Sequence, residues 1–284
     1  MSEANVQLND LGLQRKFEKM TARVRELGRV LVAYSGGIDS TLVLKVGTLA
    51  IGENCIGVTA KSETLTDEEF TLASEVAREH GMRQETIAYS ELDIESYADN
   101  PVNRCYFCKH ELYRRLDEFA RRFEACAVLD GSNADDLGDY RPGLQAVKEF
   151  QVVSILREAE MRKHEIRQMA RELGLRNWDK PSGACLSSRI PYGERIDPMK
   201  LRQIAEGEAY LRSLGFLQVR LRHHDKIARL EVESGEIARL AEPEVRTRVV
   251  EKLRALGFQH VTMDLAGYRT GSLSEHLLKD SGAS

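Results

Sequence analysis

The sequence contains little of several residue types that mark specialised classes of protein. Cysteine occurs five times in 284 residues, a small and odd number that argues against a disulfide scaffold. No apolar run approaches the roughly 20 residues of a membrane-spanning helix, and the first ten residues lack the basic and apolar regions of a signal peptide. Basic and acidic residues nearly balance, at 41 against 45, which argues against a protein that grips long nucleic acids. We therefore expect a cytoplasmic protein with reduced thiols.

Length and residue order predict two domains. A chain of 284 residues exceeds what one small core needs, and 42% hydrophobic with 30% charged residues is typical of a globular protein. Strand-like and helix-like segments alternate in the first part, which predicts an α/β domain over 1–193 built on a parallel sheet. The expected strands are 30–34, 54–60, 84–88 and 127–132, and helices are expected at 67–80 and 111–125.

A glycine-rich turn follows the first expected strand. It reads Ser35-Gly36-Gly37-Ile38-Asp39-Ser40. The G-x-x-x-x-G-K-[ST] pattern of the common nucleotide-binding loop is absent. A strand, a glycine turn and a helix start direct N–H groups and a positive dipole to one point, which is typical of a phosphate site. The two serines add hydroxyl donors, and Asp39 is a candidate ligand for the Mg²⁺ that a polyphosphate carries.

Two cysteine-containing segments carry chemically reactive side chains that the fold alone does not require. Cys105 and Cys108 form a CxxC pattern, which binds zinc, forms a redox pair or ligates a cluster. No second cysteine or histidine pair completes a structural zinc site. Cys185 lies among small residues in a loop, close to Ser188 and Arg189. A nearby arginine favours the thiolate, so Cys185 is a candidate nucleophile or ligand. Incidental or buried thiols are the alternative for all three cysteines.

The turn at 35–40 resembles the SGGxDS loop of the PP-loop ATP pyrophosphatases, a superfamily of amide-forming synthetases and sulfur-inserting enzymes. The resemblance implies that ATP is cleaved between its α and β phosphates and that the loop holds the pyrophosphate. It also implies a nucleotide site at the ends of neighbouring strands. The residues that it assigns to this site are Ala33, Ser35, Gly36, Gly37, Asp39, Ser40, Thr59, Ala60 and Gly131.

Three longer motifs narrow the resemblance to the LarE family. They read RCYFCK from Arg104, GSNADDLGDYRPG from Gly131 and ACLSSRIPYGERI from Ala184, in the family's order. LarE enzymes are ATP-dependent sulfur transferases of nickel-pincer nucleotide biosynthesis. The resemblance covers nearly the whole chain and implies the substrate pyridinium-3,5-biscarboxylic acid mononucleotide, whose carboxylates are adenylated and become thiocarboxylates. It also implies a homo-oligomer, for which a hexamer is one possibility.

The resemblance leaves the sulfur source open between two forms of the family. In the sacrificial form, the cysteine matching Cys185 attacks the acyl-adenylate and then loses its sulfur, leaving dehydroalanine. In the three-cysteine form, cysteines matching Cys105, Cys108 and Cys185 bind a [4Fe-4S] cluster, whose fourth iron holds an added sulfide. Since a sacrificial enzyme needs one cysteine only, the three-cysteine pattern favours the cluster.

Further residues are candidates for contacting the metal or the substrate. Asp135 either ligates Mg²⁺ or belongs to a helix start. Arg189 is expected to meet a substrate carboxylate or phosphate, and with Asp39, Cys185 and Ser188 it completes the expected catalytic group. Tyr106 either stacks on the pyridinium ring or belongs to the core.

The last part of the chain predicts a small α+β domain over 194–280. A weak internal repeat, LRSLGFLQVRLR from Leu211 and LRALGFQHVTMD from Leu253, predicts two similar halves with a ferredoxin-like outline. Arg220 and Arg222 alternate onto one face of the first expected strand. They form a candidate phosphate site for the mononucleotide, and a solvated strand face is the alternative.

Other functions agree with parts of the sequence. A tRNA thiolase shares the loop and the cysteines, but it needs a basic face or an RNA-binding module, and neither is clear. An amide-forming synthetase needs a source of ammonia. A non-catalytic nucleotide-binding module would leave the CxxC and the Cys185 loop unexplained. We therefore expect a small-molecule nucleotide substrate that is bound with ATP and Mg²⁺, and no membrane or nucleic-acid partner.

Overall fold

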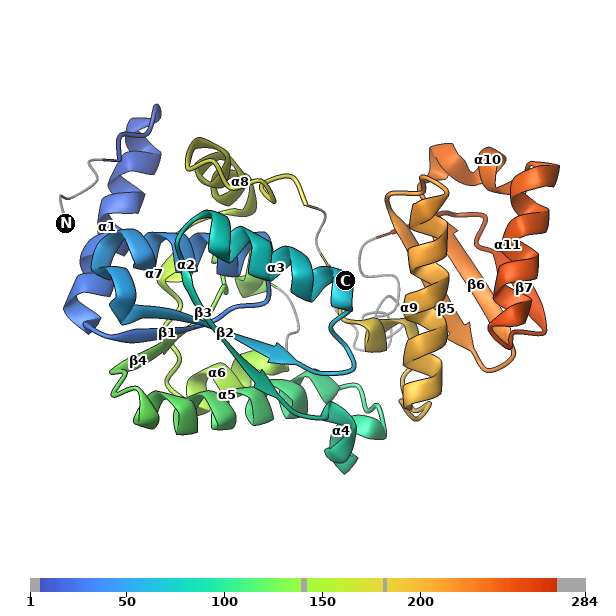
Figure 1. Ribbon diagram of the computed structural model, residues 1–284, viewed down its shortest axis with the longest axis horizontal. Coiled ribbons are helices and arrows are strands. Elements are labelled where there is room, and N and C mark those ends of the chain that lie inside the picture. Colours follow the sequence, from blue (N-terminus) through green and yellow to red (C-terminus); the bar gives the residue numbers. More distant parts are fainter. Residues whose placement is uncertain (1–5, 139–141, 181–182, 270–284) are drawn as a thin grey trace. The chain divides into compact units, whose positions relative to one another are not determined.

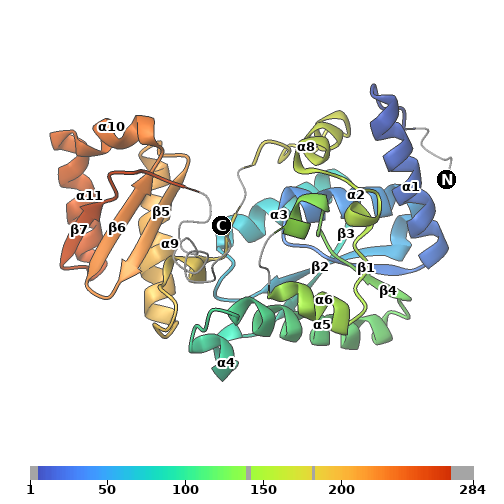
Figure 2. The same cartoon turned by 180° about the vertical axis from the view of Figure 1, so that it is seen from behind.

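A computed structural model of the chain describes residues 6–138, 142–180 and 183–269, which fold into two compact units (Figures 1 and 2). The first unit comprises residues up to 91 together with 103–183, and the second comprises 92–102 and the residues from 184 onward. The second unit therefore includes a short segment from the middle of the chain. Within the described ranges, no helix is long and apolar enough to cross a membrane.

The first unit alternates strands and helices along the chain. Its strands are β1 (Val30–Ala33), β2 (Cys55–Lys61), β3 (Arg83–Ala88) and β4 (Ala127–Leu129). Its helices are α1 (Leu11–Leu27), α2 (Ile38–Ile51), α3 (Asp67–Glu79), α5 (Arg104–Arg122), α6 (Gly143–Glu149), α7 (Ile155–Glu158) and α8 (Lys163–Glu172). Short 3₁₀ turns are η1 (Gly52–Asn54) and η3 (Ala134–Gly138), with η2 (Glu91–Asp93) where the chain passes from the first unit into the second.

The four strands form one parallel sheet in the order β3-β2-β1-β4. This confirms the predicted parallel α/β architecture. Val30 lies opposite Cys55 on one side and Ala127 on the other, so β1 is central and buried. Because the strands are parallel, their carboxyl ends share one edge, where open α/β sheets bind ligands.

Helices cover both faces of this sheet (Figure 1). Successive strand residues point to opposite faces. Val30 and Val32 accordingly pack with side chains of α1, α2, α3 and α8, whereas Leu31 packs with those of α5 and α6. The two cores hold β1 in place, and β1 in turn fixes the turn that follows it.

The second unit combines a three-stranded sheet with helices. Its elements are α4 (Glu95–Ala98), η4 (Leu186–Arg189), α9 (Pro198–Ser213), β5 (Val219–His224), β6 (Ile227–Val232), η5 (Ser234–Glu236), α10 (Ile237–Ala241), α11 (Pro243–Ala255) and β7 (His260–Met263). β5 and β6 are antiparallel, and β6 and β7 are parallel. From α9 onward the described residues thus follow an α–β–β–α–α–β order. The six-element ferredoxin-like pattern has one more strand, before its first helix, and a single helix where α10 and α11 lie.

Close packing in the second unit depends on a glycine of α9. A Cβ on Gly207 would lie 2.3 Å from Leu221 Cδ1 on β5. The missing side chain therefore lets the helix approach the sheet. Arg220 and Arg222 alternate with the buried Leu221 along β5, so they lie on its other face.

Candidate active site

The loop after β1 is held in shape by its own hydroxyl groups. Gly36 has a φ of +71°, and a Cβ on it would lie 2.5 Å from the Cβ of Ala73, so a side chain does not fit there. The Ser40 hydroxyl accepts a hydrogen bond from the Ser35 N–H at 3.2 Å and donates one to the Gly37 carbonyl at 3.1 Å. Gly37 is the N-cap residue of α2. The first-turn N–H groups of the helix therefore face the loop, as the predicted phosphate site requires.

Two asparagines from distant segments brace this loop. Asn177 Nδ2 donates to the Gly36 carbonyl at 3.2 Å and to Thr41 Oγ1 at 3.0 Å. Asn133 Nδ2 donates to Asp39 Oδ1 at 3.4 Å. Both asparagines are buried. Neither was predicted as a site residue, and the only signal in the sequence is the position of Asn133 within the GSNADD motif.

The carboxyl end of β4 meets the loop at Gly131. A Cβ on Gly131 would lie 2.9 Å from Ser40 N, so the two backbone segments approach more closely than a side chain allows. The preceding Asp130 is buried and accepts hydrogen bonds from the Ser132 and Ser154 hydroxyls at 2.5 and 2.7 Å. This network fixes the turn that carries Gly131, and the structure places Gly131 against the loop.

A lysine from α8 supplies a positive charge that the loop itself lacks. The Nζ of Lys163, the first residue of α8, lies 2.5 Å from Asp39 Oδ2. The Lys163 backbone N–H donates to Asp135 Oδ2 at 2.7 Å. The candidate Mg²⁺ ligand Asp39 is thus paired with a cation, and Asp135 accepts a hydrogen bond from the first residue of α8. No local sequence pattern distinguishes Lys163.

The other predicted nucleotide residues lie at the carboxyl edge of the same sheet. β1 ends at Ala33, opposite Val58 of β2, and Thr59 and Ala60 follow. Thr59 is buried, and its hydroxyl accepts a hydrogen bond from Gln84 Nε2 at 2.7 Å. Ala60 is half-buried. The loop 35–40 and the end of β2 therefore lie at the same edge of the sheet, where open α/β sheets bind ligands.

The CxxC pattern lies at the N-terminal end of α5. Cys105 is exposed and Cys108 is half-buried, and residues three apart share one side of a helix. Cys108 Sγ donates a hydrogen bond to Glu91 Oε1 at 2.8 Å. Glu91 is buried and also accepts from Ser62 Oγ at 3.1 Å. Glu91 is therefore a residue of this site that was not predicted from the sequence.

The donor set for an iron–sulfur cluster is divided between the units. Cys105 and Cys108 belong to the first unit, and Cys185 belongs to the second. The chemistry suits the group, because thiolates hold such clusters and all three cysteines are reduced thiols. Among the residues that the structure describes, no three His, Cys, Asp or Glu side chains gather into a metal site.

Tyr106 packs against its own helix and its neighbours. Its ring centroid lies 5.4 Å from that of Phe107 and 5.6 Å from that of His110. Its hydroxyl donates to Glu149 Oε2 at 3.0 Å. These contacts hold the Tyr106 side chain against α5 and α6, and its stacking on the substrate ring stays a prediction.

The Cys185 loop is held by a buried arginine. Cys185 is exposed and precedes the turn η4. Arg189 Nη1 donates to the carbonyls of Ala184 at 2.5 Å and Cys185 at 2.9 Å. Arg189 Nε and Nη2 donate to Glu208 Oε1 and Oε2 at 2.8 and 2.9 Å. The side chains of Arg189 and Glu208 are only 4% and 2% exposed, so this guanidinium fixes the backbone around Cys185.

Ser188 connects this loop to β5. Its N–H donates to the Cys185 carbonyl at 2.9 Å, and its hydroxyl accepts from Arg189 Nη1 at 3.0 Å. Its carbonyl accepts from Arg222 Nη1 at 2.9 Å. Arg222 also donates to both carboxylate oxygens of Glu231, at 3.0 and 2.7 Å. The predicted residues Cys185, Ser188, Arg189 and Arg222 therefore belong to one hydrogen-bonded group.

Arg220 completes a cluster of buried arginines in the second unit. It lies opposite Glu231 across the β5–β6 ladder, on the same strand face as Arg222. Burial and the neighbouring Arg189 lower the pKa of Arg220. Arg189, Arg220 and Arg222 thus lie in the buried part of this unit together with the carboxylates Glu208 and Glu231. The arginines are buried rather than on a solvated strand face.

The segment 92–102 is fastened to the chain that follows Cys185. The hydroxyls of Tyr97 and Ser187 are 2.6 Å apart. Asn100 Nδ2 donates to the carbonyls of Pro191 and Glu194 at 2.7 and 2.9 Å. These bonds explain why this segment belongs to the second unit.

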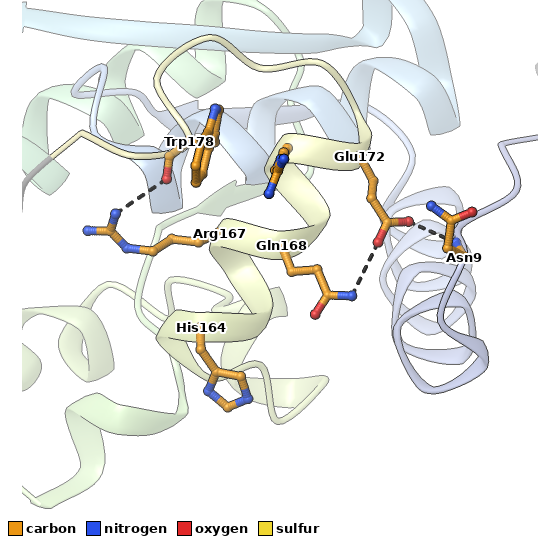
Figure 3. A pocket seen from close by; sticks show the side chains of 7 residues that line it. Asn9, His164, Arg167, Gln168, Glu172 and Trp178 are labelled. Carbon is orange, nitrogen blue, oxygen red and sulfur yellow. Dashed lines mark hydrogen bonds between the residues drawn. The ribbon is translucent and has the colours of Figure 1, made fainter.

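A separate pocket lies on α8 and contains none of the predicted site residues. It has a volume of about 710 Å³ and is lined by Asn9, His164, Arg167, Gln168, Arg171, Glu172 and Trp178 (Figure 3). Arg167 donates to the carbonyls of Trp178 at 3.5 Å and Lys180 at 3.1 Å. The Arg171 guanidinium lies 5.1 Å from the Trp178 ring centroid. We interpret these contacts as holding the residues that follow α8 against this helix.

Comparison with proteins of known sequence finds relatives that span most of the chain. An uncharacterized protein of Synechocystis sp. is 43% identical over 267 residues, which cover 94% of this chain and all of the relative. The pyridinium-3,5-bisthiocarboxylic acid mononucleotide synthase of Lactiplantibacillus plantarum is 41% identical over 268 residues, which cover 94% of this chain and 96% of that enzyme. Comparison with models of protein families gives no match.

A more distant relative shares part of the chain. One of the polypeptides of the glutamine-hydrolysing GMP synthase of Thermoplasma acidophilum is 30% identical over 190 residues, which cover 61% of this chain and 60% of that polypeptide. The similarity is thus weaker and shorter than that to the mononucleotide synthase.

Proposed function

Because the chain belongs to the LarE family, whose member in L. plantarum is a pyridinium-3,5-bisthiocarboxylic acid mononucleotide synthase, we propose that it is an ATP-dependent sulfur transferase of nickel-pincer nucleotide biosynthesis. Its substrate is pyridinium-3,5-biscarboxylic acid mononucleotide, and its products are thiocarboxylates, AMP and pyrophosphate. The observation that carries the proposal is the braced loop at 35–40, with Lys163 beside it, at the carboxyl edge of a parallel sheet.

The first half-reaction activates a carboxylate, which is a poor electrophile. A carboxylate oxygen attacks the α-phosphorus of ATP, and the bond to the bridging oxygen breaks, so pyrophosphate leaves. The first-turn N–H groups of α2 face the departing phosphates. We assign the Mg²⁺ that accompanies ATP to Asp39, because carboxylates are ligands that this ion prefers, and the Lys163 ammonium lies beside this carboxylate. The product is an acyl-adenylate, whose AMP is a good leaving group.

The second half-reaction replaces AMP with sulfur. In the route that we favour, Cys105, Cys108 and Cys185 would hold a [4Fe-4S] cluster, which when bound supplies a sulfide for transfer. In the sacrificial route, the Cys185 thiolate attacks the acyl carbon and AMP leaves. Loss of the Cys185 Cα proton then breaks the Cβ–S bond, which releases the thiocarboxylate and leaves dehydroalanine. Both routes require the exposed Cys185 thiol.

The second unit offers a site for the phosphate of the substrate. Arg220 and Arg222 are buried, and Arg189 is close enough to Arg220 to influence its charge. Guanidinium groups bind phosphate with several directed N–H donors. We therefore assign the mononucleotide phosphate to Arg220 and Arg222. Arg189 acts as a positioning residue for the Cys185 loop, because its hydrogen bonds join Glu208 to that loop.

The proposed assembly and location follow the family. We propose a homo-oligomer, with a hexamer as one form, that acts in the cytoplasm on small-molecule substrates. Light scattering of the purified protein measures the mass of the assembly, and a mass equal to one chain would contradict this part.

Pyrophosphate release tests the proposed function against its alternatives. Purified protein is incubated with Mg²⁺ and ATP, and pyrophosphate and AMP are measured with and without the biscarboxylic acid mononucleotide. We expect release that depends on this substrate and is unchanged by added tRNA. Release that depends on tRNA would support a tRNA thiolase. Release that requires ammonium and yields an amide would support an amide-forming synthetase, and a failure to release pyrophosphate would support a binding module.

A further inference from the structure

The contact between Lys163 and Asp39 has a consequence for metal binding. The loop 35–40 contains one charged side chain, that of Asp39, and no basic residue. Lys163 Nζ lies 2.5 Å from Asp39 Oδ2, although the two residues are 124 positions apart in the chain. Their side chains are 31% and 25% exposed, so both are accessible to a ligand. The carboxylate of Asp39, the candidate ligand of a divalent cation, is therefore already neutralised by the Lys163 ammonium.

The surrounding bonds keep this pair in place. The Lys163 backbone N–H is bonded to Asp135 Oδ2 at 2.7 Å, which fixes the start of α8. Asp39 Oδ1 faces the amide of the buried Asn133 at 3.4 Å. With both backbones fixed, the flexible part of the pair is the lysine side chain itself, a point charge on a four-carbon stem. The ammonium can therefore exchange one anionic partner for another nearby.

We propose that Lys163 is an internal counter-ion that keeps the divalent cation from Asp39 until the phosphates of ATP arrive. This inference rests on the proposed function, because it takes the loop as the ATP site. A free Mg²⁺ ion must displace the ammonium from Asp39 and leave it without an anion, which costs free energy. A Mg²⁺ ion that arrives with ATP brings phosphate oxygens, and the ammonium moves to them. Metal and nucleotide then bind together, and the ammonium faces the pyrophosphate as it leaves.

Titration with Mn²⁺, a paramagnetic substitute for Mg²⁺, tests this inference on the full chain. Free Mn²⁺ is measured by electron paramagnetic resonance, first without nucleotide and then with ATP. Without nucleotide, we expect Lys163→Gln to bind Mn²⁺ about three- to tenfold more tightly than the wild type. Adding Asp39→Asn to that variant should remove the gain. Lys163→Arg keeps the charge and should retain weak binding of the free metal.

A second lysine of the same unit provides a matched control. Lys16 Nζ lies 2.7 Å from Glu165 Oε1, and these side chains are 27% and 20% exposed. Lys16→Gln removes an ion pair of similar burial between α1 and α8 and should leave Mn²⁺ binding unchanged. With pyrophosphate as the ligand, calorimetry should show weaker binding to Lys163→Gln and unchanged binding to Lys16→Gln.

The outcomes separate this inference from the proposed function. Equal Mn²⁺ affinity of the wild type and Lys163→Gln, or a gain that survives Asp39→Asn, would overturn the inference. If the wild type still binds ATP with Mn²⁺ in that case, the proposed function stands. If the wild type binds no ATP with or without metal, the proposed function itself is wrong.

Discussion

The partners of Arg189 and Lys163 decide the roles of these two charged residues. Arg189 has the residue type of a substrate-binding group, and its place near Cys185 suggests that role in the sequence. The structure instead shows its donors on Glu208 and on the carbonyls of Ala184 and Cys185. The sequence pattern identified Arg189 as a site residue, but it contained no information on its ion pair with Glu208. The same limit applies to Lys163, whose partner lies 124 positions away.

We predict that Arg189→Lys removes most activity and destabilises the second unit. Lysine can pair with Glu208 but cannot span both of its oxygens and the loop carbonyls as well, so buried acceptors lose their donors, which costs about 1–3 kcal/mol. The measurements are thermal unfolding and substrate-dependent AMP formation. Arg212→Lys is the control, because Arg212 is 35% exposed and lies 3.5 Å from Glu208 Oε2. Similar, small effects of the two variants would contradict the positioning role.

A buried histidine makes the second unit sensitive to acid. His223 is 2% exposed, its Nε2 is 3.0 Å from Gln203 Oε1, and burial and then Lys200 lower its pKa below the usual 6.5. The unfolded chain therefore binds the proton first, and stability is present above pH 6.5 and lost as pH falls below it. We expect His223→Gln to lower the unfolding free energy at pH 7.5 by about 1 kcal/mol.

A comparison of the wild type with His223→Gln isolates the effect of this histidine on stability. Denaturant unfolding is measured from pH 7.5 to 5.5 for the wild type and for His223→Gln. The wild type should lose up to about 1.4 kcal/mol more per pH unit than the variant below pH 6.5. Parallel curves for the two proteins would show that His223 does not titrate in this way.

At the scale of secondary-structure elements, local pattern predicted the sheet well and the start of α5 poorly. Apolar runs marked β1, β2 and β4, because a buried parallel strand needs such runs. The edge strand β3 was also expected, although its sequence is mostly polar and none of its residues is buried. The helix expected at 111–125 instead begins at Arg104, so the CxxC lies on the helix. Its N-cap residue, Asn103, makes no capping hydrogen bond through its side chain. Tertiary packing rather than a capping signal sets this helix start.

The glycine turn before α2 gives a prediction at the same scale. Gly36→Ala should destabilise the first unit by more than about 2 kcal/mol and abolish ATP binding, because its positive φ and the contact with Ala73 both exclude a side chain. Gly174→Ala is the control, since Gly174 has a φ of +75° but no atom within 4 Å of an added Cβ. It should cost about 1 kcal/mol and leave ATP binding intact. Retained ATP binding by Gly36→Ala would be inconsistent with the loop geometry.

At the scale of the whole chain, the two domains expected over 1–193 and 194–280 stay a prediction, and the structure divides into two compact units that are not continuous in sequence. The segment 92–102 joins the second unit through Tyr97 and Asn100, which bond to residues some ninety positions later. Such contacts leave no local periodicity in the sequence. The family, by contrast, was recognisable because its motifs are long and occur in order, and the relatives cover 94% of the chain.

The cluster route makes a prediction for the composition of the protein. After purification and reconstitution without oxygen, we expect about four iron and four acid-labile sulfide per chain. Alanine at Cys105, Cys108 or Cys185 should remove most of both. Cys126→Ala is the control, because Cys126 is an exposed thiol outside the three motifs. Wild-type protein without iron under these conditions would favour the sacrificial route through Cys185.

The most direct measurement of the central claim is the mass of the substrate after reaction. Pyridinium-3,5-biscarboxylic acid mononucleotide is incubated anaerobically with the protein, Mg²⁺, ATP and a sulfide source, and the product is identified by mass spectrometry. We predict that oxygen is replaced by sulfur at a carboxylate, that AMP appears with it, and that Asp39→Asn forms neither. An unchanged substrate, or an amide in place of the thiocarboxylate, would contradict a sulfur transferase.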